Sequence, residues 1–207
     1  MVWMRILQQG KGKRSFSCCL FVLLISTVPA HAETPFLQRA LQVMQGGGGT
    51  QVVAAPASVE VAFSPGGGAT DLVVRAIGSA KQSIHVAAYS FTSRPIAKAM
   101  GEARRAGVDV DVVVDHEQIN KGSHSVVSYL LSMNIPVRVD IVHTLQHDKY
   151  MVIDGKTVET GSFNYTAAAE QHNSENVLVL WNAPQLAGAY AANWKSLWDQ
   201  AEVYRGR

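Results

Sequence analysis

The sequence predicts an α/β domain whose mixed, mainly parallel β-sheet is flanked by helices on both faces. Short apolar strands alternate with helical segments over residues 58–139, which implies crossover connections between parallel strands. The rhythm then changes to a hairpin, an antiparallel unit, over residues 150–160. A long amphipathic segment near the C-terminus predicts a helix packed on one face of the sheet.

Each element of the first part has a local signal. Apolar and polar residues alternate in the expected strands, as valines and aspartates do over residues 108–114. Apolar residues recur at helical spacing in the expected helices, where Thr70 can cap the first and Gly107 ends the second. The predicted order is a strand at 59–63, a helix at 71–80, a strand at 84–88, a helix at 95–106, a strand at 108–114, a helix at 125–133 and a strand at 137–139.

The second part begins with a turn signal, Asp154-Gly155-Lys156, between two apolar runs at 150–153 and 157–160. These runs are therefore expected to pair as a hairpin. A polar helix from about Thr166 and an apolar strand at 177–181 follow. The last expected helix, at 183–201, has one apolar face made of Leu186, Tyr190, Trp194, Leu197 and Trp198.

Residues 1–32 have the features of a secretory signal peptide. A basic start precedes an apolar stretch at 16–28, which is shorter than the ~20 residues of a membrane span, and Ala30-His31-Ala32 is a typical cleavage site. The alternative is an uncleaved anchor. Cleavage would leave no stable membrane anchor in the mature chain.

The mature chain is then expected to have two parts. Residues 33–57 form a flexible arm that contains four consecutive glycines, and residues 58–207 form the domain. The full chain has 18 Lys and Arg against 16 Asp and Glu; four of the basic residues and none of the acids lie in the signal, so the mature chain carries a net charge of −2. It has no overall positive field that would attract nucleic acid. Both cysteines, Cys18 and Cys19, also leave with the signal, which excludes a disulfide or a thiol nucleophile.

The segment that begins at His147 carries the chemistry. Residues i and i+2 of a strand share a face, so His147 and Lys149 are expected to project together. Burying a cation beside an imidazole is unfavourable unless an anion lies between them. The turn after the hairpin can bring Ser162 and Asn164 toward the same face. A nucleophile or base, a cation and neutral hydrogen-bond donors together are typical of a phosphate site.

The pattern H-x-K-x4-D-x6-G-S-x-N resembles the HKD signature of the phospholipase D superfamily, and it is matched by His147, Lys149, Asp154, Gly161, Ser162 and Asn164. From about residue 58 to the C-terminus the chain is also similar to the small, single-motif, EDTA-resistant bacterial endonucleases of that superfamily. The resemblance implies a phospholipase D-like fold. Asp154 is counted with the catalytic residues because it belongs to the signature, although its place at the turn favours a structural role.

The resemblance also implies a role for each of the other site residues. His147 would attack phosphorus and form a covalent phosphohistidine. Lys149 and Asn164 would hold the non-bridging oxygens of the substrate, and Ser162 would add a hydrogen bond. Glu175 would accept a hydrogen bond from the other imidazole nitrogen and so fix the tautomer.

This mechanism needs a second histidine, which protonates the leaving oxygen and then activates water. No second H-x-K occurs in the chain, so the resemblance implies a two-fold homodimer in which two copies of His147 share one site. The remaining histidines lack the spacing of zinc ligands, and we expect neither a metal nor a cofactor.

We therefore expect a periplasmic or secreted phosphodiesterase, most simply a metal-independent, non-specific endonuclease acting on DNA or RNA. Two alternatives stay open. The same motif also serves the hydrolysis or transfer of phospholipid head groups, and a nucleic-acid-binding module without catalysis is the second. A basic cluster is either a solvated helix face or a patch for the DNA backbone; it consists of Arg94, Lys98, Arg104 and Arg105.

Overall fold

The structure is a computed structural model that describes residues 53, 55–56, 58–119 and 124–206. By its contacts the chain divides into two units, residues 1–51 and 52–207, and the fold below is that of the second unit. The expected signal peptide and nearly all of the expected arm lie outside the described residues. No helix within the described ranges is long and apolar enough to cross a membrane.

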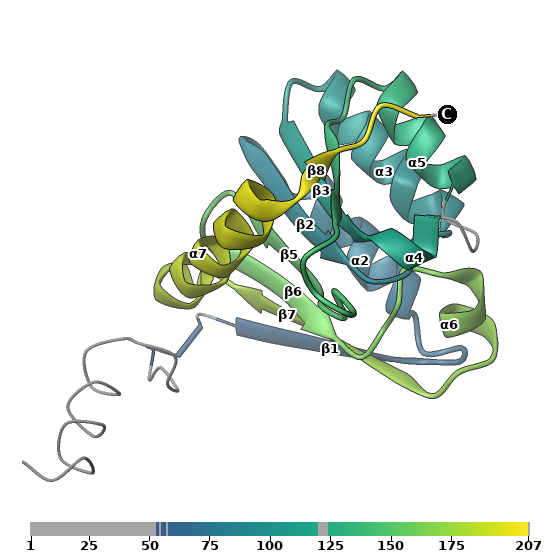
Figure 1. Ribbon diagram of the computed structural model, residues 1–207. Helices are drawn as coiled ribbons and strands as arrows, with labels where there is room; N and C mark the ends of the chain where they lie inside the picture. The colour runs from purple at the N-terminus through teal and green to yellow at the C-terminus, as the bar shows by residue number, and fades with distance from the viewer. Residues whose placement is uncertain (1–52, 54, 57, 120–123, 207) are drawn as a thin grey trace, which may run out of the picture. The chain divides into compact units, whose positions relative to one another are not determined.

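The described residues form an eight-stranded sheet with the order β1-β7-β6-β5-β2-β3-β4-β8 (Figure 1). Most of these strands are short, and β8 is a two-residue strand near the C-terminus. Their bounds are β1 (Ser58–Ser64), β2 (Ser83–Ala88), β3 (Asp109–Asp115), β4 (Val137–Asp140), β5 (Lys149–Ile153), β6 (Thr157–Gly161), β7 (Glu175–Trp181) and β8 (Glu202–Val203).

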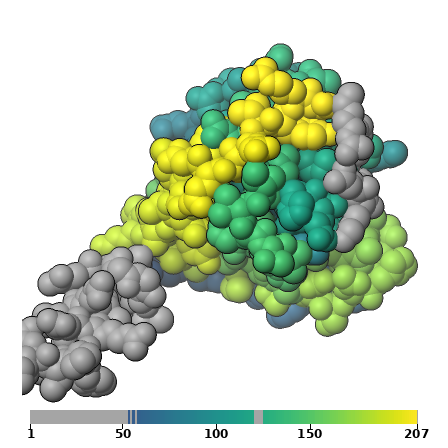
Figure 2. Space-filling view, viewed as in Figure 1, coloured from purple at the N-terminus to yellow at the C-terminus, as the bar shows by residue number. Residues whose placement is uncertain are grey.

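Helices lie on both faces of the sheet, as expected (Figure 1). One face carries α7, and the other carries α2, α3 and α5. Figure 2 shows the C-terminal residues, in yellow, as a ridge beside the green segment that follows β4. The bounds are α2 (Ala69–Gly78), α3 (Arg94–Arg105), α4 (His116–Gln118), α5 (His124–Ser132), α6 (Ala167–Gln171) and α7 (Pro184–Gln200).

The sheet is mixed, but the expectation that it is mainly parallel is wrong. The pairs β2–β3 and β3–β4 are parallel, as the crossover helices α3 and α5 require, whereas the other neighbouring pairs among the described strands are antiparallel. The physical reason lies in long-range pairing. β1 looks like the first parallel strand in the sequence, but it lies at the sheet edge and pairs antiparallel with β7, with Ser58 opposite Trp181.

Each helical layer buries its own apolar cluster. On the α7 face, Trp194 and Leu197 pack with residues of β2, β3, β5 and β6, and the indole N–H of Trp194 donates to the carbonyl of Val86 at 2.9 Å. On the opposite face, Ile77 of α2 and Met100 of α3 are fully buried against the sheet. Both faces of the central strands are therefore packed, and this gives the loops at the strand ends a rigid support.

β1 departs from the expected burial pattern. Its alternation predicts a half-buried strand, and the strand is present. Its larger apolar side chains, however, form the exposed face: Val59 is 50% exposed, Val61 is 56% exposed and Phe63 is 59% exposed. The buried face carries the small residues Ala62 and Ser64. The extensive contacts of α7 are with β2, β4, β5 and β6, which leaves this side of β1 uncovered.

Candidate active site

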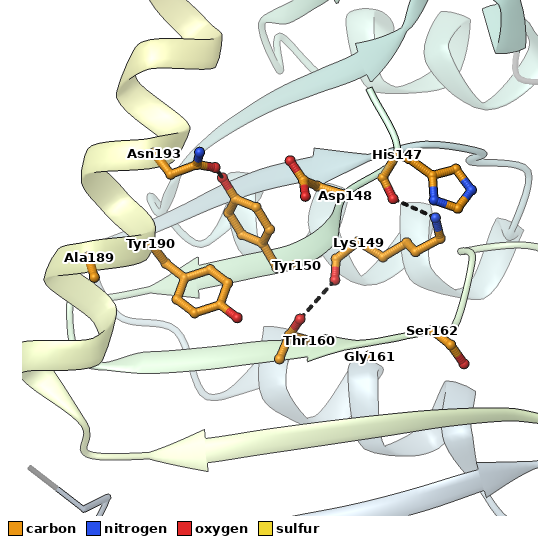
Figure 3. Close-up of a pocket in the computed structure, with 10 residues that line it drawn as sticks. All are labelled: His147, Asp148, Lys149, Tyr150, Thr160, Gly161, Ser162, Ala189, Tyr190 and Asn193. Atoms are coloured by element: carbon orange, nitrogen blue, oxygen red, sulfur yellow. Dashed lines mark hydrogen bonds between the residues drawn. The ribbon is translucent and has the colours of Figure 1, made fainter. Parts of the chain in front are cut away.

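His147 and Lys149 lie at one end of the sheet, where β5 begins beside the end of β2 and Lys149 stands opposite Ala88. His147 comes before β5, and its side chain is exposed. Lys149 is the first residue of β5 and is only 7% exposed. Its ammonium group donates to the carbonyl oxygen of His147 at 2.6 Å (Figure 3). The two side chains share one pocket, with the imidazole outermost.

The charge of Lys149 is held in a partly apolar setting. Burial lowers the pKa of Lys149, and the nearby carboxylates of Asp148 and Glu175 oppose this by raising it. A cation that has lost part of its hydration interacts more strongly with an incoming anion than a surface lysine does. The ammonium group is therefore suited to receive the oxygens of a phosphate group.

Tyr89 packs against the side chains of both His147 and Lys149 from outside the pocket lining, and it was not among the predicted site residues. Its ring centroid is 4.5 Å from that of His147, and the Lys149 ammonium lies 4.9 Å from the Tyr89 centroid. The Tyr89 hydroxyl accepts a hydrogen bond from Gln118 at 3.1 Å, and its backbone N–H donates to the carbonyl of Asp148 at 3.0 Å. In the sequence Tyr89 is recognisable as an aromatic residue directly after a predicted strand. Its contact with the motif depends on the β2–β5 pairing, which the local sequence does not show.

The pocket extends from His147 along the sheet face to helix α7 and has a volume of about 610 Å³. At the helix end, the Tyr150 hydroxyl donates to Asn193 at 2.6 Å, and the Tyr150 and Tyr190 rings meet edge-on at 4.9 Å. Burial raises the pKa of Tyr150 far above its ordinary value, so this hydroxyl stays a neutral donor. Figure 3 shows the two ends, the imidazole and ammonium on one side and the tyrosines on the other.

Ser162 and Glu175 are joined directly. The Ser162 hydroxyl donates to one Glu175 carboxylate oxygen at 2.5 Å, and Asn173 donates to the other at 3.0 Å. The Ser162 oxygen in turn accepts from the backbone N–H of Asn176 at 3.1 Å. A serine hydroxyl can donate only one hydrogen bond, and here Ser162 donates it to Glu175. The expected hydrogen bond from Ser162 to a substrate requires this arrangement to change, whereas each Glu175 oxygen keeps a further lone pair that can accept from an imidazole.

Gly161 and Asn164 frame the same turn. A Cβ on Gly161 would collide with the backbone carbonyl of Asn176 in β7, so this close approach of two strands requires glycine. Asn164 lies two residues beyond Ser162 and does not line the pocket itself. Its side-chain oxygen is buried without a hydrogen-bond partner, which is unfavourable by about 1–3 kcal/mol. Its side chain is therefore not fixed by a hydrogen bond within the described chain.

Asp154 lies at the other end of β5 and does not line the pocket. Its carboxylate accepts hydrogen bonds from three successive backbone N–H groups, those of Lys81, Gln82 and Ser83, at 2.7–3.1 Å. Burial raises its pKa, but these hydrogen bonds outweigh the effect and lower the pKa below its ordinary value. Asp154 ties the hairpin turn to the start of β2, and this is a structural role.

The described residues contain no group of three or more His, Cys, Asp or Glu side chains placed to hold a metal ion. His143, which is close to the motif in sequence, contacts Asp140 at 2.7 Å and does not line the pocket. The pocket instead combines an accessible imidazole with a buried ammonium group. An imidazole can attack an electrophile, and the ammonium can neutralise the charge that develops on its oxygens.

Several known proteins are similar to this chain in sequence. Residues 73–198 match the family model described as cardiolipin synthase, PLD-like domain. The chain is 38% identical over 138 residues to a phospholipase D from Rickettsia bellii (strain RML369-C), which covers 67% of this chain and 68% of that protein. It is 32% identical over 129 residues to a mitochondrial cardiolipin hydrolase from Xenopus laevis, covering 62% of this chain and 60% of that one.

Solved structures share the fold. A phospholipase D family member, Nuc from Salmonella typhimurium, superposes with a TM-score of 0.70 at 46% identity, covering 72% of this chain and 99% of that one. NucT from Helicobacter pylori superposes with a TM-score of 0.62 at 21% identity, covering 71% and 100%. The second likeness concerns the fold alone.

Proposed function

Because the chain belongs to the phospholipase D superfamily, we propose that it is an exported, metal-independent endonuclease that acts through a covalent phosphohistidine. The observation that carries the proposal is the pairing of an exposed His147 imidazole with the buried Lys149 ammonium in one open pocket. An imidazole in solvent reach can meet a phosphodiester, and a partly desolvated cation beside it favours the negative charge of that group.

The reaction is proposed as two displacements at phosphorus. In the first, a nitrogen lone pair of His147 forms a bond to phosphorus while the bond to the leaving oxygen breaks, and that oxygen takes a proton from a second imidazole. In the second, the same imidazole removes a proton from water, the water oxygen bonds to phosphorus, and the phosphorus–nitrogen bond breaks. The two steps together replace one difficult displacement by two easier ones, and the second step regenerates His147.

Lys149 neutralises the non-bridging oxygens in both steps, with Asn164 as a second donor once its side chain turns to the substrate. The ammonium thus supplies positive charge that many nucleases take from a metal ion. Glu175 accepts a hydrogen bond from the Ser162 hydroxyl at 2.5 Å, and it thereby fixes the loop that carries Asn164. The remaining lone pairs of the Glu175 carboxylate can accept from an imidazole.

The second imidazole is proposed to be the partner subunit's His147, in a two-fold dimer that shares one site. The loop that leads into His147 supports such an interface, because Ile141 is 51% exposed, Val142 is 58% exposed and Leu145 is 46% exposed. Asp140 anchors this loop by accepting from the backbone N–H of Val142 at 2.8 Å. A well-anchored apolar loop beside an incomplete site is suited to contact with another copy of the chain.

Export rests on the sequence of residues 1–32, and we propose a periplasmic or secreted address for the mature chain. Determination of the N-terminal residue of protein recovered outside the cytoplasm tests this. The proposed cleavage gives Glu33 as the first residue. A chain that starts at Met1 contradicts it.

A phospholipid substrate is the second candidate, since relatives named phospholipase D and mitochondrial cardiolipin hydrolase match the chain. Purified protein should be incubated with plasmid DNA, with RNA and with cardiolipin vesicles, each with and without excess EDTA. The proposal predicts cleavage of nucleic acid that EDTA does not reduce. Cleavage of lipid alone establishes the second candidate, and loss of nucleic-acid cleavage in EDTA refutes metal independence.

A further inference from the structure

A buried acid lies on the strand that leads into the Ser162 loop. Glu159 of β6 is 1% exposed, and the Tyr165 hydroxyl, on a fully buried ring, donates to it at 2.6 Å. The residues beside Glu159 in the sheet are Met151 of β5 and Val179 of β7, both apolar and buried. A charged carboxylate is strongly disfavoured in such surroundings. Burial raises the pKa of Glu159 to about 8, although the hydrogen bond from Tyr165 lowers it.

Tyr165 connects two parts of the site. Its carbonyl oxygen accepts hydrogen bonds from the backbone N–H groups of Thr92 and Ser93, both at 2.8 Å. Its ring meets Phe91 edge-on at a centroid distance of 5.7 Å. It also follows Asn164 directly in the chain. Tyr165 therefore joins the segment 161–166, which carries Ser162 and Asn164, to the segment 89–93.

The segment 89–93 begins with Tyr89, whose ring contacts both His147 and Lys149. The position of the Ser162–Asn164 loop relative to the imidazole and the ammonium thus depends on where Tyr165 is fixed. The hydrogen bond to Glu159 fixes the hydroxyl end of the Tyr165 ring. Because small displacements of a donor are costly in phosphoryl transfer, this bond has a consequence for catalysis.

We propose that Glu159 is a positioning residue that fixes Tyr165 and through it aligns the Ser162–Asn164 loop with His147 and Lys149. This inference rests on the proposed function, since it concerns how that site is kept in register. Glu159 touches neither the pocket nor its substrate, and it acts through Tyr165.

The same contact gives the site a pH dependence. The titratable group that faces Glu159 is Tyr165, and Tyr150 is the further group that acts on Tyr165. Above about pH 8 the ionised Glu159 would hold the Tyr165 hydroxyl more strongly, but it would also place a charge between apolar neighbours, and this cost of burial favours local opening around Tyr165. Glu159→Gln keeps an acceptor for the Tyr165 hydroxyl and removes the titration.

The test measures kcat and KM on bis(4-nitrophenyl) phosphate between about pH 6 and pH 10 for three variants. Tyr165→Phe should lower kcat by about ten- to a hundredfold and raise KM by a smaller factor, because the misaligned loop holds the phosphate oxygens less well. Tyr204→Phe is the matched control, because its buried hydroxyl has no hydrogen-bond partner, and it should leave kcat unchanged. Glu159→Gln should keep kcat at neutral pH within about threefold and move the alkaline loss of activity to higher pH, because the titration of Glu159 is removed.

Wild-type kcat in Tyr165→Phe, or an alkaline limb in Glu159→Gln that coincides with that of the wild type, overturns the inference. Calorimetric titration with inorganic phosphate separates it from the proposed function. Weaker phosphate binding by Tyr165→Phe than by the wild type supports alignment by Tyr165 even where no diester is cleaved. A wild type that neither binds phosphate nor cleaves a diester refutes the proposed function and this inference together.

Discussion

The ammonium nitrogen of Lys149 lies 2.6 Å from the backbone carbonyl oxygen of His147. The cation of the site is thus hydrogen-bonded to the backbone of the proposed nucleophile. A phosphate group that contacts the ammonium is thereby brought to the imidazole, and the geometry requires no large movement of either residue.

Lys149→Ala should reduce kcat by about a hundred- to a thousandfold, which corresponds to about 3–4 kcal/mol, because a preorganised charge is removed. In Glu159→Gln, which lacks the Glu159 titration, activity should fall on the alkaline side as the pH rises through the lowered pKa of Lys149, since only the protonated form carries the charge. Steady-state kinetics across pH measure both effects. Lys195→Ala, whose ammonium is exposed and paired with Asp199, serves as the control, and an equal loss in both variants would rule out the special role of Lys149.

Asp154→Ala should destabilise the fold by about 2–3 kcal/mol, because three backbone N–H groups lose their acceptor. Its backbone φ of 51° adds strain for alanine, whereas Asp154→Asn tolerates that conformation and keeps an oxygen acceptor. Urea denaturation compares the variants, and kcat measured well below Tm should stay near that of the wild type. A large loss of kcat in folded Asp154→Asn would instead place this residue in the chemistry.

Asp154 also contributes a pH dependence of stability at the acid end. Its pKa is lower in the folded chain than in the unfolded one. Its stabilisation is therefore complete above the ordinary aspartate pKa and is lost as the pH falls through the folded value.

Glu159 should make the wild type less stable as the pH rises. The folded chain binds the proton more tightly than the unfolded chain, so the free energy of unfolding falls between about pH 4.5 and pH 8, with a slope approaching ~1.4 kcal/mol per unit, and is level above that range. Thermal denaturation across this range measures it. Glu159→Gln should lack this decline, and a Gln variant with the same decline would show that another group causes it.

The dimer should depend on the loop before His147. Val142→Glu places a charge on that loop and should shift the protein from dimer to monomer in sedimentation, with a matching loss of cleavage. Val61→Glu is a matched control, because Val61 is 56% exposed and Val142 is 58% exposed. Full activity in a monomeric Val142→Glu protein would refute the shared site.

Local patterns predicted most of the strands and helices. The hairpin of β5 and β6 follows from its Asp-Gly turn and two apolar runs, and the apolar face of α7 packs on the sheet as its spacing predicts, with Trp194 and Leu197 buried. The superfamily, inferred from the six motif residues, is confirmed. The direction of β1 was not predictable in this way, because its partner β7 lies more than a hundred residues away and the pairing leaves no local signal.

Within the site, the sequence indicates the residue types but not their contacts. The spacing of His147 and Lys149 places them together, whereas the contact of Tyr89 with both depends on a cross-sheet register. The hydrogen bond from Ser162 to Glu175 likewise depends on a cross-sheet register, since the pairing of β6 with β7 brings these residues together. The short elements α4 and β8 have too few residues to show any periodicity.

The covalent intermediate is tested most directly by rapid quenching of wild-type protein with substrate that carries labelled phosphorus, followed by peptide mass spectrometry. The account predicts label that is stable in base, labile in acid and located on His147, with none on a His147→Asn variant that folds normally and does not turn over. Complete turnover without label on the protein at any quench time would contradict it.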